Sequence, residues 1–337
     1  MSDAHATSPT REAPLEALPE ALLEARELVK EFPLDRRRSV HAVSNVSLAI
    51  YEGETLAVVG ESGCGKSTLG RMLIGALPPT SGELRFRGTT ISGLKERDFA
   101  PYRRQLQLVF QDPYASLDPR MKVRDLIAEP LVTHRVCATK DETTQRVLEL
   151  MSAVGIPQDY LNRYPHQFSG GQRQRIGIAR ALALDPALIV CDEPVSALDV
   201  SVQNQILNLL NELQDAHGLT YLFISHDLSV VRHISDRVCV MFLGKVMELG
   251  PTEEVFDAPR HPYTRFLLDA VQPPDPHRRG EELRLLEGEP PSPVAPPSGC
   301  VFRTRCPYAT ERCASREPEL RREGSVWVAC HRVDGSR

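Results

Sequence analysis

The feature that most constrains this chain is a glycine-rich segment, residues 60–67, with the sequence GESGCGKS. It fits the pattern G-x-x-x-x-G-K-[ST], in which the backbone wraps around an anion. Residues 54–59 before it are typical of a buried strand, and residues 67–77 after it have a helical composition that ends at Pro78 and Pro79. A strand, a tight loop and a helix in this order predict an α/β fold.

The loop predicts a site for a chain of phosphates. Gly60, Gly63 and Gly65 let the backbone curl, so that successive N–H groups point at phosphate oxygens beside the N-terminus of a helix. Lys66 adds a point charge, and the Ser67 hydroxyl is a ligand for Mg²⁺. The other expected nucleotide-binding residues of the loop are Ser62, Cys64 and Thr68, of which Cys64 occupies a variable position and needs no catalytic role.

Two carboxylates follow an apolar strand at residues 187–191. Sheets of this class place their ligands at the carboxyl ends of strands. We therefore expect Asp192 to hold the Mg²⁺ shell and Glu193 to act as general base on the attacking water. Taken alone, the pair is equally compatible with a surface turn that opens at Pro194, but the upstream loop favours catalysis. A second apolar strand at residues 220–225 predicts a parallel sheet.

A third segment, Ser169-Gly170-Gly171-Gln172, precedes a strongly helical run. Serine is a good N-cap, and two glycines permit close approach of the backbone to an anion. By itself the segment is also compatible with an ordinary capped helix.

Composition excludes several classes of protein. The 337 residues include 40 basic and 45 acidic ones, and the net charge of -5 offers no general attraction for nucleic acid. Apolar runs such as residues 187–191 and 238–243 are far shorter than the roughly 20 residues that span a bilayer. The N-terminal stretch lacks the apolar region of a secretory signal. We expect a cytoplasmic chain whose membrane contact is peripheral.

In this order the motifs resemble those of ABC transporter ATPases. Residues 109–113 (VFQDP) resemble the Q-loop, which implies that Gln111 reaches the metal and the water. Residues 196–199 resemble the D-loop with Asp199, and residues 225–227 carry a switch histidine, His226, that would contact the γ-phosphate.

The resemblance also gives the Ser169 segment a role. In that family two cassettes pack head to tail, and the signature motif of one completes the ATP site of the other. Ser169, Gly170, Gly171 and Gln172 resemble this motif, although Phe168 stands where the family most often has leucine. Mg²⁺ would be held by Ser67, Gln111 and Asp192.

The family implies a P-loop NTPase fold with a RecA-like parallel-sheet core, an antiparallel β subdomain and a helical subdomain. The expected boundaries are a flexible leader at 1–24, the ABC cassette at 25–255 with its helical subdomain at about 113–168, a family extension with a Pro-rich linker at 256–298, and a cysteine-containing module at 299–337. An aromatic residue before the first strand usually stacks on adenine, and Phe32 is the nearest candidate. The basic insertion Arg36-Arg37-Arg38 leaves Val40 as an aliphatic alternative.

Narrower features resemble the second ATPase of dipeptide and oligopeptide importers: residues 111–120 (QDPYASLDPR), residues 261–264 (HPYT) and the tail 299–331. The resemblance implies an ATPase at the cytoplasmic face of the membrane. Its partners would be a second ATPase subunit in a heterodimer, two transmembrane permease subunits and an extracytoplasmic substrate-binding protein. Alternative cargoes are nickel chelates and glutathione, and a soluble non-transport ABC ATPase is the other class.

The tail carries Cys300, Cys306, Cys313 and Cys330, spaced C-x5-C-x6-C-x16-C. This spacing is wider than that of common zinc modules. The resemblance implies a [4Fe–4S] cluster on these four thiolates. Zinc, with His331 as a further ligand, and thiols that bind no metal are the alternatives.

Overall fold

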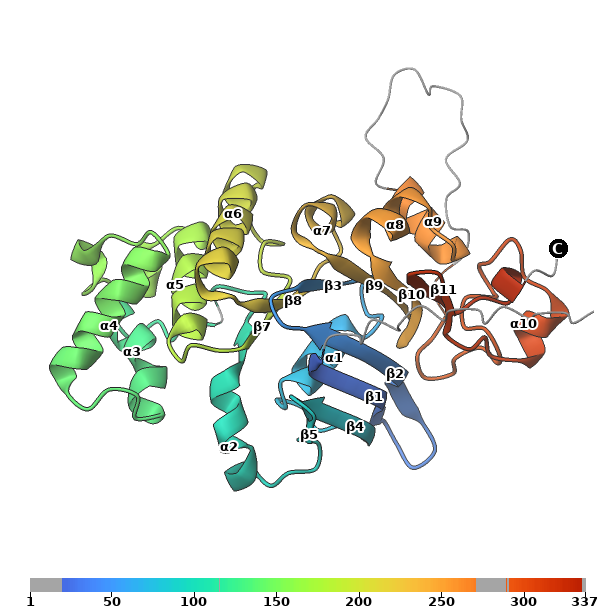
Figure 1. Ribbon diagram of the computed structural model, residues 1–337, viewed down its shortest axis with the longest axis horizontal. Helices are drawn as coiled ribbons and strands as arrows, with labels where there is room; N and C mark the ends of the chain where they lie inside the picture. Colours follow the sequence, from blue (N-terminus) through green and yellow to red (C-terminus); the bar gives the residue numbers. More distant parts are fainter. Residues whose placement is uncertain (1–19, 115, 271–288, 290, 335–337) are drawn as a thin grey trace, which may run out of the picture.

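The computed structural model describes residues 20–114, 116–270, 289 and 291–334. Most of the expected leader, and residues 271–288 of the expected linker, lie outside the described residues. Figure 1 shows an elongated molecule in which the helical subdomain and the C-terminal module occupy opposite ends. The central sheet and a smaller antiparallel sheet lie between them.

The central sheet has eight strands in the order β11-β12-β10-β9-β3-β8-β7-β6. Strands β6, β7, β8, β3 and β9 are parallel neighbours, and β10 is antiparallel to β9. Every residue of β3, β7 and β8 is buried, as expected for parallel strands covered on both faces. The bounds are β3 Thr55–Val59, β6 Leu106–Val109, β7 Leu188–Asp192, β8 Thr220–Ile224, β9 Arg237–Phe242 and β10 Lys245–Pro251. The predicted α/β fold is confirmed.

The smaller sheet has the order β2-β1-β4-β5 and is antiparallel. Its strands are β1 Ala21–Pro33, β2 Ser39–Tyr51, β4 Ser81–Phe86 and β5 Thr89–Thr90. Strand β1 begins four residues before the expected start of the cassette, because Leu22 and Leu23 are buried against the helix after the glycine loop. The basic insertion forms the β1–β2 turn, where Asp35 Oδ1 accepts hydrogen bonds from the backbone of Arg37 and Arg38.

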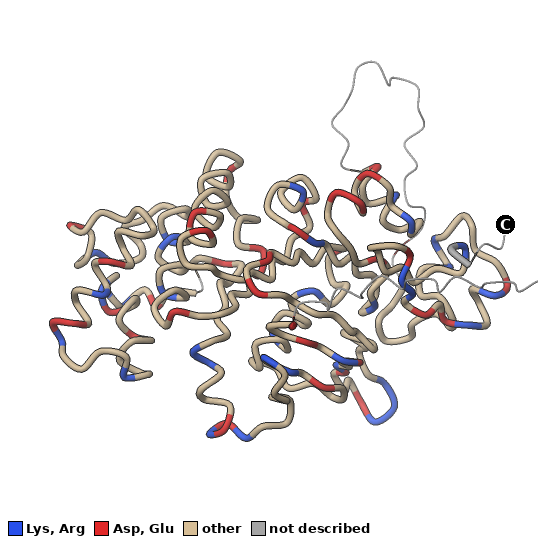
Figure 2. The backbone as a smooth tube through the Cα atoms, viewed as in Figure 1, with Lys and Arg blue, Asp and Glu red and all other residues tan. Residues whose placement is uncertain are grey.

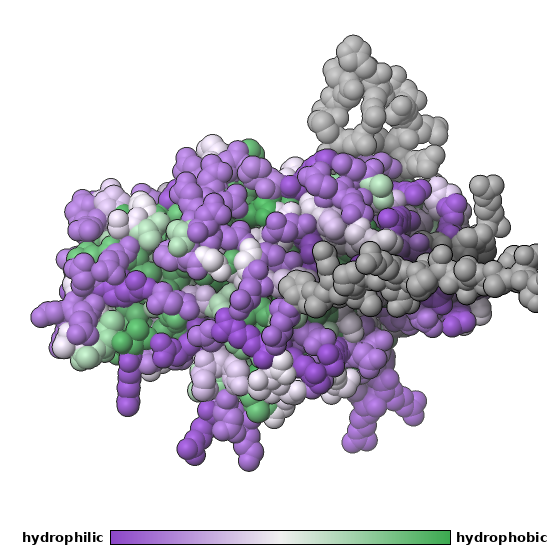
Figure 3. All heavy atoms as spheres, viewed as in Figure 1, coloured by the Kyte–Doolittle hydropathy of each residue, from purple (hydrophilic) through white to green (hydrophobic). Residues whose placement is uncertain are grey.

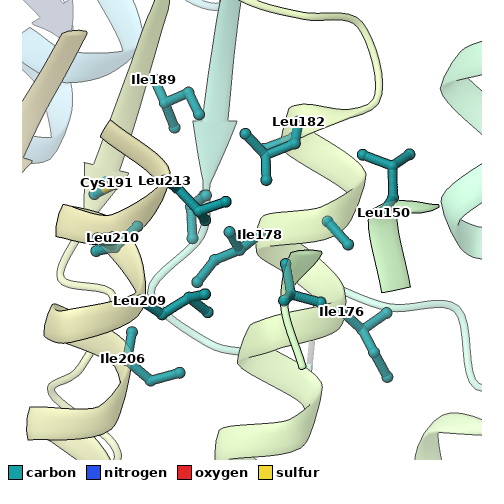
Figure 4. Packing of buried hydrophobic residues seen from close by; sticks show 14 of the residues in the cluster. Leu150, Ile176, Ile178, Leu182, Ile189, Cys191, Ile206, Leu209, Leu210 and Leu213 are labelled. Atoms are coloured by element: carbon teal, nitrogen blue, oxygen red, sulfur yellow. The ribbon is translucent and has the colours of Figure 1, made fainter. Parts of the chain in front are cut away.

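The helices are distributed around the two sheets (Figure 1). Helix α1 (Lys66–Leu73) lies between the two sheets, and α2 (Glu96–Gln105), which the sequence did not predict, precedes β6. The expected helical subdomain contains α3 (Val123–Thr133), α4 (Lys140–Ala153) and the short 3-10 turns Gln158–Tyr160 and Pro165–Gln167. It packs on α5 (Gly170–Leu182) and α6 (Val200–His217). Figure 4 shows Ile178 of α5 pointing toward apolar side chains of α6, such as Leu209 and Leu213, whereas Ile176 points to the other side of α5.

The C-terminal part continues the central sheet instead of forming a separate body. Strand β12 pairs with β10, so that Glu248 lies opposite Val328 and Leu249 opposite Trp327. The remaining elements are α7 Leu228–Ile234, α8 Thr252–Asp257, α9 Pro262–Asp269, α10 Glu311–Ser315, β11 Arg321–Glu323, β12 Val326–Val328 and the 3-10 turn His331–Asp334. Among the described helices, none has the length and apolar character required to cross a bilayer.

Candidate functional site

Four loops meet at one edge of the central sheet. Strands β6, β7, β8 and β3 are consecutive parallel neighbours, so their carboxyl ends point the same way. Gln111 follows β6, Glu193 follows β7, His226 follows β8, and the glycine loop follows β3. This edge is the usual ligand site of such sheets.

Two glycines of the loop are required by close backbone contacts. Gly60 and Gly65 have φ angles of 149° and 104°. A Cβ on Gly60 would lie 2.1 Å from the Met241 carbonyl oxygen, and one on Gly65 would lie 2.1 Å from the Ala42 carbonyl oxygen. The loop is therefore wedged between β2 and β9, and its curvature depends on glycine.

Lys66 lies inside this curve and is 5% exposed. Its ammonium donates to the carbonyl oxygens of Gly60 at 2.8 Å and Glu61 at 3.1 Å. Cys64 is buried beside it, and this burial raises the pKa of the thiol, so the group stays neutral. Ser62 is exposed, while Thr68 is partly buried in α1. The lysine is thus a nearly buried cation without a carboxylate partner among the described residues.

Ser67 and Asp192 form the contact expected of a Mg²⁺ site. The Ser67 hydroxyl donates to Asp192 Oδ1 at 2.7 Å, and Asp192 is 3% exposed. A hydroxyl and a carboxylate are hard oxygen donors of the kind that Mg²⁺ prefers. The donor chemistry of these residues fits the ion.

Glu193 stands at the centre of a second cluster. Gln111 Nε2 donates to Glu193 Oε2 at 2.8 Å, and His226 Nδ1 lies 3.3 Å from the same oxygen. The Glu193 backbone has a φ of 47°, an uncommon value for a residue with a side chain, and its N–H donates to the Ile224 carbonyl. Such strain is typical of functional positions. The structure therefore brings together three residues that lie far apart in the sequence.

The Ser169 segment belongs to another part of the molecule. Ser169 is exposed at the start of α5, where its hydroxyl accepts from the Gln172 backbone at 3.3 Å and its own N–H donates to Gln172 Oε1 at 3.1 Å. The two glycines have a packing role that the sequence did not reveal. Cβ atoms on Gly170 and Gly171 would lie 3.1 Å from Leu198 and 2.4 Å from Val202.

Asp199 caps α6. Its Oδ1 accepts from the Val202 backbone at 3.0 Å and from the Ser201 hydroxyl at 2.7 Å. These hydrogen bonds, above all the one from Val202, hold the pKa of the Asp199 carboxyl below its usual value. Asp199 is therefore a charged, exposed residue next to the Ser169 segment.

Phe32 lies near the end of β1 opposite Val40 of β2 and is 38% exposed. Lys30 Nζ lies 5.3 Å from the centre of its ring. Because Ala42, two residues beyond Val40, contacts the glycine loop, this end of the smaller sheet is close to the loop. Phe32 and Val40 therefore both lie at the end of the smaller sheet that is close to the glycine loop.

A hollow of about 620 Å³ separates the core from the helical subdomain. Gln111 and Phe110 lie at its wall beside residues of α3 such as Pro130 and Thr133. Several large apolar side chains are exposed in this region, namely Phe110, Tyr114 and Val132. Figure 3 shows apolar surface gathered over the helical subdomain, at the left of the view.

The side chains of the four tail cysteines lie near one another. Burial, together with the neighbouring Cys313, Cys306 and Cys330, raises the pKa of the Cys300 thiol to about 11. His331 Nε2 lies 2.9 Å from the Arg316 carbonyl oxygen. Within the described ranges, however, no group of three or more His, Cys, Asp or Glu side chains is arranged to hold a metal ion. The expected iron–sulfur cluster has no support from this geometry.

Sequence reasoning missed two residues that contact the glycine loop. Glu61 is bound by Tyr263 of α9 and by Arg305 of the C-terminal module. Tyr263 belongs to the HPYT segment, whose physical role the sequence did not reveal. No local pattern could have linked Arg305 to the loop.

Family models match two parts of the chain. The ABC transporter model matches residues 43–196, and the model for the C-terminal region of oligopeptide/dipeptide transporters matches residues 247–313. The chain is 53% identical over 298 residues to the oligopeptide transport ATP-binding protein OppF of Escherichia coli (strain K12), covering 88% of this chain and 89% of OppF. It is 53% identical over 323 residues to the oligopeptide transport ATP-binding protein AppF of Bacillus subtilis (strain 168), covering 93% and 97%.

Solved structures agree. The dimeric post-hydrolysis structure of the ATP-binding cassette MJ0796 bound to ADP and Pi has a TM-score of 0.63 and 30% identity, covering 68% of this chain and 98% of that one. CbiO1 of Clostridium perfringens, part of the ABC transporter complex cbiONQ, has the same TM-score and identity and covers 71% and 92%.

Proposed function

Because the chain belongs to the ABC transporter ATPases of the oligopeptide importer type, we propose that it supplies ATP binding and hydrolysis to a membrane importer of dipeptides and oligopeptides. The observation that carries this proposal is the convergence of Ser67, Asp192, Glu193, Gln111 and His226 at one sheet edge. The high identity of the chain to oligopeptide transport ATP-binding proteins, over nearly their whole length, supports peptides as the cargo class.

We assign the phosphates of ATP to the glycine loop. The backbone N–H groups of the curve and the N-terminus of α1 would bind phosphate oxygens. Lys66 would exchange its two carbonyl contacts for the β- and γ-phosphates. Phe32 would stack on the adenine, with Val40 as the alternative surface.

Ser67, Asp192 and Gln111 would hold the Mg²⁺ ion. The ion, when bound, neutralises charge that develops on the phosphates. Glu193 would accept the proton of the attacking water while a bond forms between the water oxygen and the γ-phosphorus and the bond to the β–γ bridging oxygen breaks. Gln111 and His226 already contact Glu193 Oε2 and would hold this carboxylate in position.

We assign Ser169, Gly170, Gly171, Gln172 and Asp199 to the contact with a second ATPase subunit. This assignment is supported by the exposed positions of Ser169 and Asp199, which cap α5 and α6. The helix N-terminus at Ser169 would face the γ-phosphate of the ATP that the neighbouring subunit holds. We propose a heterodimer, as the importer resemblance implies.

We propose that the hollow beside Phe110 and α3 contacts the two permease subunits. The chain would then lie on the cytoplasmic face of the membrane, as the importer resemblance implies. Exposed apolar side chains around a hollow are typical of a protein-binding surface. An extracytoplasmic binding protein would complete the assembly. Figure 2 shows acidic and basic residues interspersed along the chain, which supports a partner other than nucleic acid.

An iron–sulfur cluster on Cys300, Cys306, Cys313 and Cys330 remains a separate proposal. It rests on the family resemblance and on the cysteine spacing C-x5-C-x6-C-x16-C, and the present arrangement of the four thiols would have to tighten around the cluster. Anaerobically purified protein should contain iron and absorb broadly in the visible range. A sample that lacks both, or that contains zinc, would dismiss the cluster.

The test of the proposed function is reconstitution of the importer. The chain is co-purified with its permease, incorporated into lipid vesicles and supplied with the binding protein. Short peptides should raise ATP hydrolysis and enter the vesicles. Stimulation by a nickel chelate or glutathione instead would reassign the cargo, and hydrolysis without any permease association would favour a non-transport ATPase.

A further inference from the structure

The glycine loop is tied to the C-terminal module through Glu61. Arg305 Nη1 donates to both carboxylate oxygens of Glu61 at 2.9 Å. The Arg305 side chain is 7% exposed and that of Glu61 is 25% exposed. Because the guanidinium is almost wholly removed from water, loss of its partner would leave a poorly solvated charge. Removing one partner of this pair is therefore costlier than removing one partner of a surface ion pair.

A second contact reaches the same residue from α9. The Glu61 backbone N–H donates to the Tyr263 hydroxyl at 3.0 Å. The Tyr263 ring is fully buried and packs on Phe242 of β9, with ring centres 4.8 Å apart, and on Phe302 of the C-terminal module, with ring centres 5.3 Å apart. Phe242 and Phe302 also contact each other at 5.3 Å. The hydroxyl is thus held by an aromatic cluster that the cassette and the module share.

The position of Arg305 depends on the turn between two cysteines. Arg305 directly precedes Cys306, and its backbone N–H donates to the Phe302 carbonyl at 3.0 Å. Cys300 opens the same turn and donates from its backbone to the Cys313 carbonyl at 2.8 Å. The fold of the cysteine turn therefore decides where the guanidinium lies.

Both contacts act on the start of the loop and leave its later part available. The N–H of Glu61 is used by Tyr263 and its carboxylate by Arg305, so neither group is available to a phosphate. The later N–H groups of the loop are not bound by Tyr263 or Arg305, and that of Cys64 donates to the Glu61 carbonyl within the loop at 3.3 Å. A loop held in its binding shape loses less conformational freedom when the ligand arrives.

We propose that Arg305 and Tyr263 are positioning residues for the glycine loop, through which the C-terminal module raises the affinity of the cassette for nucleotide. The proposal rests on the proposed function, because it requires that the loop bind nucleotide. It assigns the module a role in ATP binding, apart from any metal on its cysteines.

Calorimetry of the full chain with Mg-ADP tests the proposal. Arg305→Gln and Glu61→Gln should each raise Kd by about fivefold or more. The double variant should lose no more than either single variant, because the second change has no interaction left to remove. Tyr263→Phe keeps the ring in the aromatic cluster and removes only the hydroxyl, and it should also raise Kd.

The matched control is Glu317→Gln. Lys245 of β10 pairs with Glu317, so this ion pair also joins the module to the cassette. The pair is formed by side chains, whereas the nearby contact with the loop is made by the backbone N–H of Gly244, which donates to the Cys64 carbonyl at 2.9 Å. The control should leave Kd within about twofold. Thermal unfolding of each variant separates loss of module docking from loss of nucleotide affinity.

Three results would overturn the proposal: unchanged Kd in both Arg305→Gln and Tyr263→Phe, additive losses in the double variant, or an equal loss in Glu317→Gln. If wild-type protein bound no Mg-ADP, the proposed function would fail as well. Suppose instead that wild-type protein bound Mg-ADP, that Lys66→Ala weakened this binding and that Arg305→Gln did not. Only the positioning role would then be wrong.

Discussion

The glycine loop and the Ser169 segment each open a helix, yet they are held in different ways. The loop is fixed by residues distant in sequence: Ala42 and Met241 crowd its glycines, and Asp192 accepts from Ser67. The Ser169 segment is closed by its own capping box with Gln172, and its serine is exposed. We call the glycine loop and the sheet edge around it the inward half of the site. We call the exposed Ser169 segment the outward half.

The difference indicates which half of the nucleotide site one chain can build. The sheet edge holds a buried lysine, a Mg²⁺-type oxygen pair and a candidate base within a single chain. The Ser169 segment completes its own hydrogen bonds and contacts none of these residues. We therefore propose that the glycine loop and the sheet edge of one chain bind one nucleotide, and that the Ser169 segment acts on the nucleotide of a neighbouring subunit.

The largest expected effect is that of Glu193→Gln. Glutamine keeps the shape of the side chain but cannot accept a proton from water, so turnover should fall by about 10³-fold. ATP binding should persist, because the loop is untouched. Steady-state phosphate release and equilibrium ATP binding measure the two effects, and wild-type turnover in this variant would refute the base assignment.

Ser169→Arg addresses the outward half directly. A long cation at this exposed cap should block the approach of a second subunit, and turnover of the assembled ATPase should fall by about 10²-fold. Binding of Mg-ADP to the single chain should stay within about twofold. A comparable loss of single-chain affinity would show that the two turns are not separate halves.

Lys66→Ala should act on the inward half. Removing the buried ammonium should weaken binding of Mg-ADP to the single chain by about 10- to 100-fold. Lys95→Ala, which removes an exposed lysine before α2, is the matched control and should leave Kd unchanged. Equal affinities for Lys66→Ala and wild type would contradict the role of the loop.

The smallest expected effect is that of Thr139→Ala, which removes a helix cap outside the proposed subunit contact. The Thr139 hydroxyl accepts from the Glu142 backbone at 3.1 Å and caps α4 in the helical subdomain. Thr139→Ala should lower the free energy of unfolding by about 1 kcal/mol. Turnover should not change. Denaturant unfolding measures the loss of stability, and phosphate release measures turnover. If Thr139→Ala lowered turnover as much as Ser169→Arg does, loss of a helix cap would explain both variants.

The inward half was largely predictable from sequence. Continuous apolar runs mark β7 and β8, and the glycine pattern marks the loop, because both signals are local. The family resemblance gave Gln111 and His226 roles beside Glu193, but the strand order that brings the three together comes from the structure. Sequence reasoning therefore reached most residues of the sheet edge.

What escaped prediction depends on contacts across long stretches of chain. Helix α2 carries Pro101, and Phe99 is its one buried side chain, so it has little apolar periodicity. The pairing of β12 with β10 joins the module to the central sheet without a local signal. The Arg305–Glu61 pair spans 244 residues. The packing of Gly171 on Val202 likewise depends on where α6 lies.

The most direct test of the divided site is a structure of the Glu193→Gln ATPase assembled with its permease and partner subunit in the presence of Mg-ATP. We expect Lys66 to contact the phosphates of one ATP molecule while Ser169 of the same chain contacts the γ-phosphate of the ATP held by the neighbouring subunit. The account would be contradicted if Ser169 touched no nucleotide, or if Lys66 and Ser169 of one chain enclosed the same ATP molecule.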